Sequence, residues 1–291
     1  MQKKTGKRLC ALLLAAALLV VLCGCGEIAP RPEQETSAEL SSAPLSVYFF
    51  DAGKADAILL STPDAAVLID CGEKGFGGTI TDELAARGIE KLDLLIITHF
   101  DRDHVGGAPK VIGSVEIGKV LQSNCPKDSR EYRKYNRALD KAAIDPLTVR
   151  EPLSFSLDGV SITVDPPREE RYAEDESNNS SLIVTVTLGS QTLLFLGDAE
   201  SARIAEYLSG TPVDCTLLKV PHHGGREPMT ATLLEAVCPE YAVITCSDAE
   251  RESASTTAAL RSCGAEIFLT RLGPVSVRCD GETIEVFYDR S

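Results

Sequence analysis

The sequence predicts a mixed α/β (α+β) fold in which two mixed β-sheets face each other and helices cover their outer sides. Apolar runs of strand length are interleaved with segments of helical spacing, and hairpin-like pairs of strands occur in both halves. Of the 291 residues, 44% are hydrophobic and 25% are charged. This mixture is typical of a globular protein and excludes wholesale disorder, a collagen-like repeat or a polytopic membrane protein.

The first half of the body is predicted to consist mainly of strands. Apolar runs between glycine or polar breaks indicate strands at 45–50, 57–60, 65–70, 92–98 and 117–121. Helical spacing predicts a helix over 79–87, which Gly88 ends, and another over 128–143, before Pro146.

The second half alternates more regularly between the two kinds of element. Strands are expected at 160–164, 182–188, 191–196, 215–220, 241–245, 266–270, 275–278 and 283–288. Helices are expected at 199–208, 230–237 and 255–263. Gly189 and Ser190 separate two apolar runs and predict a hairpin.

The amino terminus has the pattern of an export signal. Four basic residues precede an uncharged apolar run over 9–23, which is shorter than the roughly 20 residues of a membrane-spanning helix. Leu22-Cys23-Gly24-Cys25 resembles a bacterial lipoprotein signal with Cys25 as the lipid-bearing residue, although a plain cleaved signal is an alternative. We therefore expect a signal peptide at 1–24, a flexible spacer at 25–44 and a domain at 45–291, anchored at the extracellular face of the membrane.

The formal charge of −14 argues against tight binding to nucleic acid without sequence preference, because such binding depends on lysine and arginine. A phosphate substrate must therefore be held locally. One basic cluster falls at helical spacing and could either hold a phosphate backbone or form a solvated helix face; it comprises Arg130, Arg133, Lys134, Arg137 and Lys141. Nothing in the sequence indicates a protein partner.

All four histidines lie in two short clusters that each follow a predicted strand: His99 with His104, and His222 with His223. Loops at strand ends can bring imidazoles and carboxylates to one point, where a divalent ion favours their approach. An extended segment would aim residues 99, 101 and 103 to one side, so that Asp101 and Asp103 join the first cluster and His104 reaches a second ion. Asp198, at the end of another strand, is placed to bridge two cations.

The order of these motifs resembles the metallo-β-lactamase superfamily, in the variant found in the soluble domain of ComEC-type competence proteins. The resemblance rests on His99-x-Asp101-x-Asp103-His104, Asp198 and His222-His223-Gly224, with further landmarks at 51–57, 68–72 and 178–182. It implies an αββα sandwich with the metal site at one edge. It also implies that His99 and Asp101 serve one ion, Asp103 and His104 the other, Asp198 both, and either His222 or His223 the second.

The sequence departs from the usual superfamily pattern in its ligands. Asp101 stands where histidine is more usual, and no histidine lies between His104 and His222. Asn179, Ser180, Ser181 or water could replace the missing ligand. The harder ligand set favours Mn²⁺ over Zn²⁺ but leaves zinc open.

Two residues outside the ligand motifs are further candidates. Asp56 is expected to orient a ligand histidine, although an ordinary turn acid fits its sequence equally well. Lys219 could contact a substrate phosphate or merely flank its strand. Both alternatives remain open at this point.

A pair of divalent ions suits hydrolysis, with Asp103, His104 and Asp198 as catalytic residues. The resemblance implies a phosphodiesterase or nuclease that acts on DNA or related phosphodiesters. One alternative is a hydrolase of lactams, lactones or small phosphoesters, because one fold hosts many reactions. Another is a DNA- or ligand-binding module without turnover, although such a module would not require both Asp101 and Asp103.

Overall fold

The computed structural model describes residues 43–174 and 176–290, which belong to one compact unit. The predicted signal peptide, Cys25 and nearly all of the predicted spacer lie outside the described residues. Within 43–174 and 176–290, no helix combines the length and the apolar character needed to cross a membrane.

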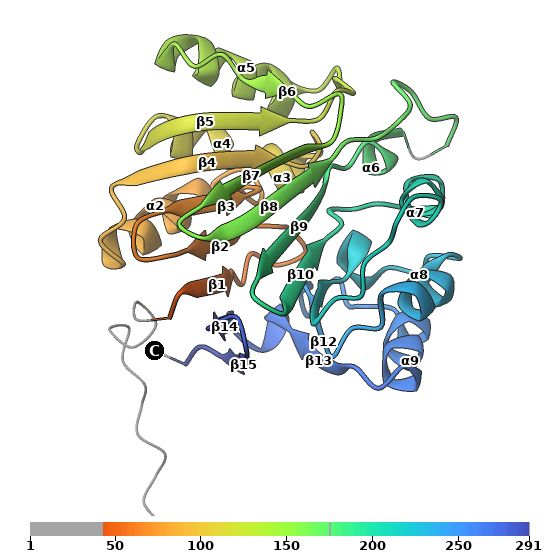
Figure 1. Cartoon of the computed structure of the whole chain (residues 1–291). Helices are drawn as coiled ribbons and strands as arrows, with labels where there is room; N and C mark the ends of the chain where they lie inside the picture. The colour runs from red at the N-terminus through yellow and green to blue at the C-terminus, as the bar shows by residue number, and fades with distance from the viewer. Residues whose placement is uncertain (1–42, 175, 291) are drawn as a thin grey trace, which may run out of the picture. The chain divides into compact units, whose positions relative to one another are not determined.

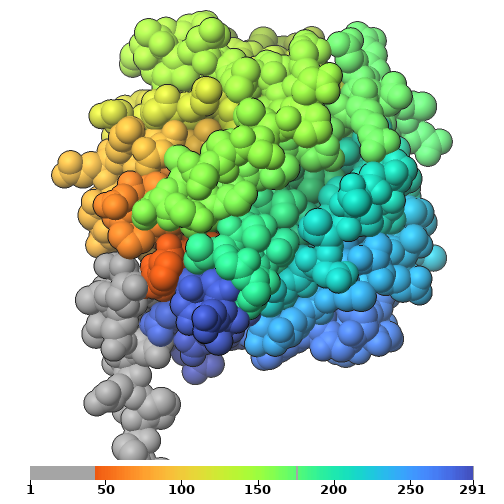
Figure 2. All heavy atoms as spheres, in the orientation of Figure 1, coloured from red at the N-terminus to blue at the C-terminus, as the bar shows by residue number. Residues whose placement is uncertain are grey.

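The first sheet has eight strands in the order β15-β14-β1-β2-β3-β4-β5-β6 (Figure 1). Neighbours are antiparallel from β15 to β3 and parallel from β3 to β6. The strands are β1 (Leu45–Phe49), β2 (Ile58–Ser61), β3 (Ala66–Ile69), β4 (Lys91–Ile97), β5 (Glu116–Gln122), β6 (Leu147–Thr148), β14 (Val275–Cys279) and β15 (Ile284–Tyr288). Both ends of the described chain thus meet in one sheet, and Figure 2 shows β1 against the carboxyl-terminal strands.

The second sheet has seven strands in the order β13-β12-β11-β10-β9-β8-β7. It is parallel from β13 to β10 and antiparallel from β10 to β7. The strands are β7 (Leu153–Leu157), β8 (Val160–Asp165), β9 (Ile183–Leu188), β10 (Gln191–Phe195), β11 (Leu217–Lys219), β12 (Tyr241–Ile244) and β13 (Glu266–Leu269). The predicted hairpin is confirmed, because β9 and β10 pair across Gly189 and Ser190.

Three hydrophobic layers hold the domain together. The middle layer lies between the sheets, and the outer layers lie under helices on either side. The first sheet is covered by α2 (Gly77–Ala86), α3 (Arg102–Val105), α4 (Ala108–Ile112) and α5 (Arg130–Ala142). The second is covered by α7 (Ser201–Leu208), α8 (Thr230–Val237) and α9 (Ala254–Ser262), while α6 (Glu176–Asn179), η1 (Pro221–Gly224) and η2 (Thr270–Leu272) are short connections. The predicted fold, two mixed sheets flanked by helices, is confirmed.

The central strands carry apolar side chains on both faces, because one face packs against the other sheet and the other face packs against helices. In β4, Leu94 and Ile96 enter the layer between the sheets, whereas Leu95 and Ile97 enter the layer under the helices. Successive side chains of a strand point to opposite faces, so a strand covered on both sides reads as one continuous apolar run. This is why the central strands could be predicted from the sequence.

The prediction of an extended segment through the first histidine cluster is wrong at its second half. Residues Arg102–Val105 form the helical turn α3, and Asp101 is its N-cap residue. Backbone bonds from the amides of His104 and Val105 to the carbonyl of Asp101 close this turn. Helical geometry therefore sets the directions of the Asp103 and His104 side chains. The expectation that residues 99, 101 and 103 point to one side of an extended segment does not apply to Asp103.

Candidate metal centre

Three strand ends deliver the candidate ligands to one edge of the paired sheets. His99 follows β4, and the adjoining turn α3 carries Asp103 and His104. Asp198 follows β10 after Gly197, and His223 lies in η1 after β11. Gly197 has a φ of 54°, and a Cβ there would lie 3.0 Å from the Ser181 hydroxyl. Glycine is therefore required for the turn that presents Asp198.

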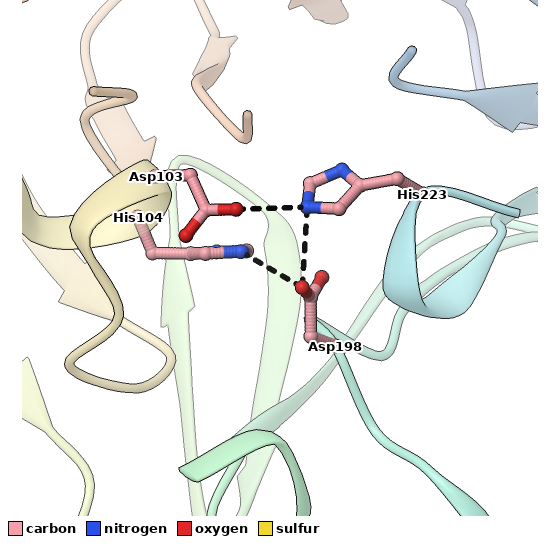
Figure 3. A group of neighbouring side chains, drawn as sticks. All are labelled: Asp103, His104, Asp198 and His223. Atoms are coloured by element: carbon pink, nitrogen blue, oxygen red, sulfur yellow. Dashed lines mark ion pairs between the residues drawn. The ribbon is translucent and has the colours of Figure 1, made fainter. Parts of the chain in front are cut away.

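Four side chains converge at this edge: Asp103, His104, Asp198 and His223 (Figure 3). One ligand atom from each lies within 4.8 Å of all the others. Asp198 Oδ2 is 3.2 Å from Nε2 of His104 and 3.1 Å from Nε2 of His223. His223 Nε2 is 3.5 Å from Asp103 Oδ2. Ligands about 2.0–2.2 Å from a zinc-sized ion lie at about these separations from one another, so the geometry fits a divalent cation.

Several of these ligand atoms also lack a hydrogen-bond partner within the described part of the chain, which is consistent with a bound cation. Nε2 of His104, Nε2 of His223 and Oδ1 of Asp198 are buried without a hydrogen-bond partner among the described residues. Nε2 of His99 is also buried without a hydrogen-bond partner among the described residues. The ring centroid of His99 lies 4.1 Å from that of His104. Buried polar atoms without partners are costly, whereas a bound ion would satisfy several at once.

Asp70 fixes the orientation of His104 from behind. Oδ2 of Asp70 lies 2.8 Å from Nδ1 of His104 and also accepts a hydrogen bond from the Thr98 hydroxyl at 2.6 Å. The backbone amide of Thr98 donates to Asp70 Oδ1 at 2.8 Å. In the neutral imidazole, a hydrogen bond from Nδ1 to a carboxylate leaves the lone pair on Nε2, which then faces the candidate ligand cluster.

A chain of buried polar groups fixes His223 in the same way. Nδ1 of His223 lies 2.9 Å from the Thr245 hydroxyl, which donates to Asp56 Oδ1 at 2.6 Å. The other oxygen of Asp56 forms a fully buried ion pair with Lys219. Lys219 also donates to the Gly197 carbonyl at 2.9 Å and lies 3.6 Å from Asp198 Oδ1. Asp56 therefore lies behind a candidate ligand histidine, to which it is linked through Thr245.

Charge governs the protonation of the cluster. Burial lowers the pKa of His99 to about 4, which leaves its imidazole neutral near pH 7. Burial also disfavours the charged form of His104, but the carboxylates of Asp198 and Asp70 outweigh it and raise the pKa of His104 well above its usual value. Burial raises the pKa of Asp198, but His223 and His104 dominate and hold it well below the ordinary range. A metal ion must therefore displace a proton from His104 in order to bind its imidazole.

Two predicted ligands lie apart from the group of four. His222, 28% exposed, directs Nδ1 to Glu200 Oε1 at 2.9 Å. The Asp101 carboxylate accepts hydrogen bonds from Lys127 and Ser177. Of the two adjacent histidines, the one that the structure brings to Asp198 is His223.

The remaining candidates have mostly supporting positions. Ser181 lies 3.4 Å from His99 Nδ1 and accepts a hydrogen bond from the Asp198 amide at 3.1 Å. Asn179 is buried and binds the backbone of Arg203. Lys219, fully buried against Asp56, is not at the surface where a substrate phosphate could reach it. No roles were assigned to Asp70 and Thr245 from the sequence. Asp70 lies in the landmark at 68–72, whereas the only signal for Thr245 was a polar residue at the end of a strand.

A cavity of about 390 Å³ opens over the cluster. Asp103 and Asp198 line it, and so do three cationic side chains: Lys54, Arg102 and Lys127. Its other lining residues are Phe100, Asp101, Ser129, Glu131, Asn178 and His222. A substrate in this cavity would meet both the cluster and positive charge.

Comparison with known proteins agrees with this geometry. The family model described as "Metallo-beta-lactamase superfamily" matches residues 51–247. The "Competence protein ComA" of Neisseria gonorrhoeae is 28% identical over 228 residues, covering 77% of this chain and 29% of that protein. The "ComE operon protein 3" of Bacillus subtilis is 26% identical over 220 residues, covering 68% of this chain and 28% of that protein. The chain thus spans less than a third of these relatives.

Solved structures share the fold at low identity. The metallo-beta-lactamase fold protein YhfI from Bacillus subtilis aligns with a TM-score of 0.54 at 11% identity, covering 78% of this chain and 96% of that chain. CmlA, a diiron beta-hydroxylase from Streptomyces venezuelae, aligns with a TM-score of 0.52 at 14% identity, covering 81% and 54%. These likenesses concern the fold, which hosts more than one kind of reaction.

Proposed function

Because the chain belongs to the metallo-beta-lactamase superfamily, whose model matches most of it, we propose that it is a metal-dependent phosphodiesterase that cleaves DNA or related phosphodiesters. The chain carries the metal-binding geometry of a hydrolase fold and has relatives named for competence. The reaction and the substrate are the parts that require a test.

The convergence of Asp103, His104, Asp198 and His223, whose buried atoms include three without a hydrogen-bond partner among the described residues, carries the proposal. In this proposal these four hold one divalent ion, while His99, Asp101 and Asp198 hold a second. Bound ions would supply Lewis-acid polarisation of the substrate and a more acidic water near neutral pH. The carboxylate-rich set favours Mn²⁺ over Zn²⁺ as the resident ion.

The protein residues have defined tasks in this reaction. Asp70, and Asp56 through Thr245, keep His104 and His223 facing the cluster. Lys54, Arg102 and Lys127 would bind the anionic phosphate in the cavity. Local positive charge is needed because the chain as a whole is acidic.

The basic face of α5 supports a polymeric substrate. The helix starts beside the cavity, since Ser129 and Glu131 are among the cavity residues. Its exposed basic residues are Arg130, Arg133, Arg137 and Lys141. A phosphate backbone longer than the cavity could continue along this face.

We also propose export and lipid attachment at Cys25, with the domain held at the extracellular face of the membrane. The lipoprotein-like Leu22-Cys23-Gly24-Cys25 supports this proposal. Mass spectrometry of the purified full chain should find the new amino terminus at a diacylglyceryl-modified Cys25. An unmodified amino terminus upstream of Cys25 would contradict it.

Metal analysis and DNA hydrolysis by the full chain test the proposed activity directly. We expect cleavage of single- or double-stranded DNA with Mn²⁺, Mg²⁺ or Zn²⁺, and of a bis-aryl phosphodiester. Asp103→Ala should lose one bound metal equivalent and turnover. Unchanged cleavage by this variant would place the active centre elsewhere, and turnover of a chromogenic cephalosporin without phosphodiester cleavage would favour a lactam hydrolase.

A further inference from the structure

The two sets of ligands in the proposed function are unequal in the structure. Asp103, His104, Asp198 and His223 form a compact group within 4.8 Å. In the proposed second set, which is His99, Asp101 and Asp198, two buried atoms have no hydrogen-bond partner among the described residues: Nε2 of His99 and Oδ1 of Asp198. The second of these lies 3.6 Å from the Lys219 ammonium. The third member of this set, Asp101, is already engaged by a cation of the protein itself.

That cation is Lys127, in the connection between β5 and α5. Its ammonium donates to Asp101 Oδ1 and, at 3.1 Å, to the Ser177 hydroxyl. Ser177 also donates to the same oxygen of Asp101. The side chains of Lys127 and Asp101 are 39% and 27% exposed, so the pair is only partly screened by solvent.

We propose, on the basis of the proposed metal-dependent function, that Lys127 competes with the ion that would bind His99, Asp101 and Asp198. The protein then holds one ion tightly at Asp103, His104, Asp198 and His223, and a second ion weakly until Lys127 leaves Asp101. An ammonium and a divalent cation repel each other, so both cannot stabilise the same carboxylate oxygen at full strength.

The Lys127 side chain could move from Asp101 into the adjoining cavity. Lys127 and Asp101 both line the 390 Å³ cavity, and a lysine side chain has a flexible four-carbon stem. An anionic phosphate in the cavity would attract the ammonium away from Asp101. Substrate and second ion would then favour each other's binding, because such coupling is reciprocal.

The test measures metal binding and does not depend on turnover. The full chain, freed of metal and kept in detergent, is titrated with Mn²⁺ alone by calorimetry. Electron paramagnetic resonance follows the spin coupling that appears when a second Mn²⁺ arrives beside the first. The variants are Lys127→Gln and Lys127→Ala, with Ser177→Ala to remove a neutral hydrogen bond from the same carboxylate. Lys119→Gln, on the exposed side of β5, is the control for loss of one positive charge.

We expect both Lys127 variants to bind the second ion about tenfold more tightly, or better, while the first ion changes by less than about twofold. Ser177→Ala should have a smaller effect, and Lys119→Gln should change neither constant by more than about twofold. An unchanged second constant in both Lys127 variants, or an equal shift in Lys119→Gln, would overturn the inference. Two equally tight ions in the unaltered chain would overturn it while leaving the proposed function standing. If the unaltered chain binds no ion, the proposed function fails as well.

Discussion

Nδ1 of His104 lies 2.8 Å from Oδ2 of Asp70, and both side chains are fully buried. The carboxylate fixes which ring nitrogen carries the proton and which faces the cluster. Asp70 itself has a φ of 58°, a left-handed backbone conformation that asparagine also tolerates. The role of its charge can therefore be tested without straining the backbone at this position.

Asp70→Asn should weaken binding of the tighter metal ion about 10- to 100-fold, because the amide is a poorer acceptor for the imidazole proton. Calorimetric titration with Mn²⁺ checks this expectation. Asp82→Asn, an exposed change on α2, serves as the control and should bind like the unaltered chain. Equal metal affinity in Asp70→Asn would show that His104 needs no such partner.

The two adjacent histidines should differ in their effects. Both have left-handed backbone angles, with φ of 48° and 52°, so asparagine is the suitable replacement. We expect His223→Asn to lose one metal equivalent and His222→Asn to retain both, because only His223 faces Asp198. Metal analysis after gel filtration measures the difference. The reverse outcome would exchange the roles of the two residues.

Metal removal should lower the free energy of unfolding. A ligand that binds only the folded state at a free concentration of 100 times its dissociation constant stabilises by about 2.7 kcal/mol. Denaturant titration of the full chain with and without Mn²⁺ would measure this. Asp103→Ala should show a reduced response to the metal, and a response equal to that of the unaltered chain would argue for binding at another place.

The buried pair of Lys219 and Asp56 should be sensitive to the loss of one partner. Lys219→Met leaves Asp56 charged and buried, and we expect a loss of roughly 3–5 kcal/mol in the free energy of unfolding. Adding Asp56→Asn should recover part of this loss. If the double variant is as unstable as the sum of the two single changes, the pair is not coupled.

Charge reversal on α5 should separate polymeric from small substrates. Arg130→Glu with Arg137→Glu should raise KM for DNA and reduce the salt dependence of binding, because fewer phosphate contacts remain. Hydrolysis of a bis-aryl phosphodiester should stay unchanged. Arg261→Glu, on α9, provides the control. An equal loss on both substrates would instead indicate damage to the metal centre.

The central strands and the convergence of three distant segments were predictable from the sequence. Leu94 to Ile97 form an unbroken apolar run because both faces of β4 are covered, and histidines follow where such strands end. These are local patterns with a direct physical cause. The family resemblance then supplied the order of the layers.

The distribution of contacts within the centre could not be predicted in this way. The choice between His222 and His223 depends on Glu200 and Thr245, which are distant in sequence from each other. The engagement of Asp101 by Lys127 likewise depends on how the connection before α5 packs. Such contacts are decided by tertiary structure, which a periodicity does not encode.

The candidate ligands come from the ends of strands in two different sheets. Asp103 lies after β4 of the eight-stranded sheet, whereas Asp198 and His223 lie after β10 and β11 of the seven-stranded sheet. During synthesis Asp103 and His104 emerge first, and they can meet Asp198 and His223 only after most of the chain has been made. A nascent chain that ends before Thr245 would possess every ligand of the compact group but lack the hydroxyl that aims His223. Ion uptake should accordingly be a late event in maturation, after the two halves have closed on each other.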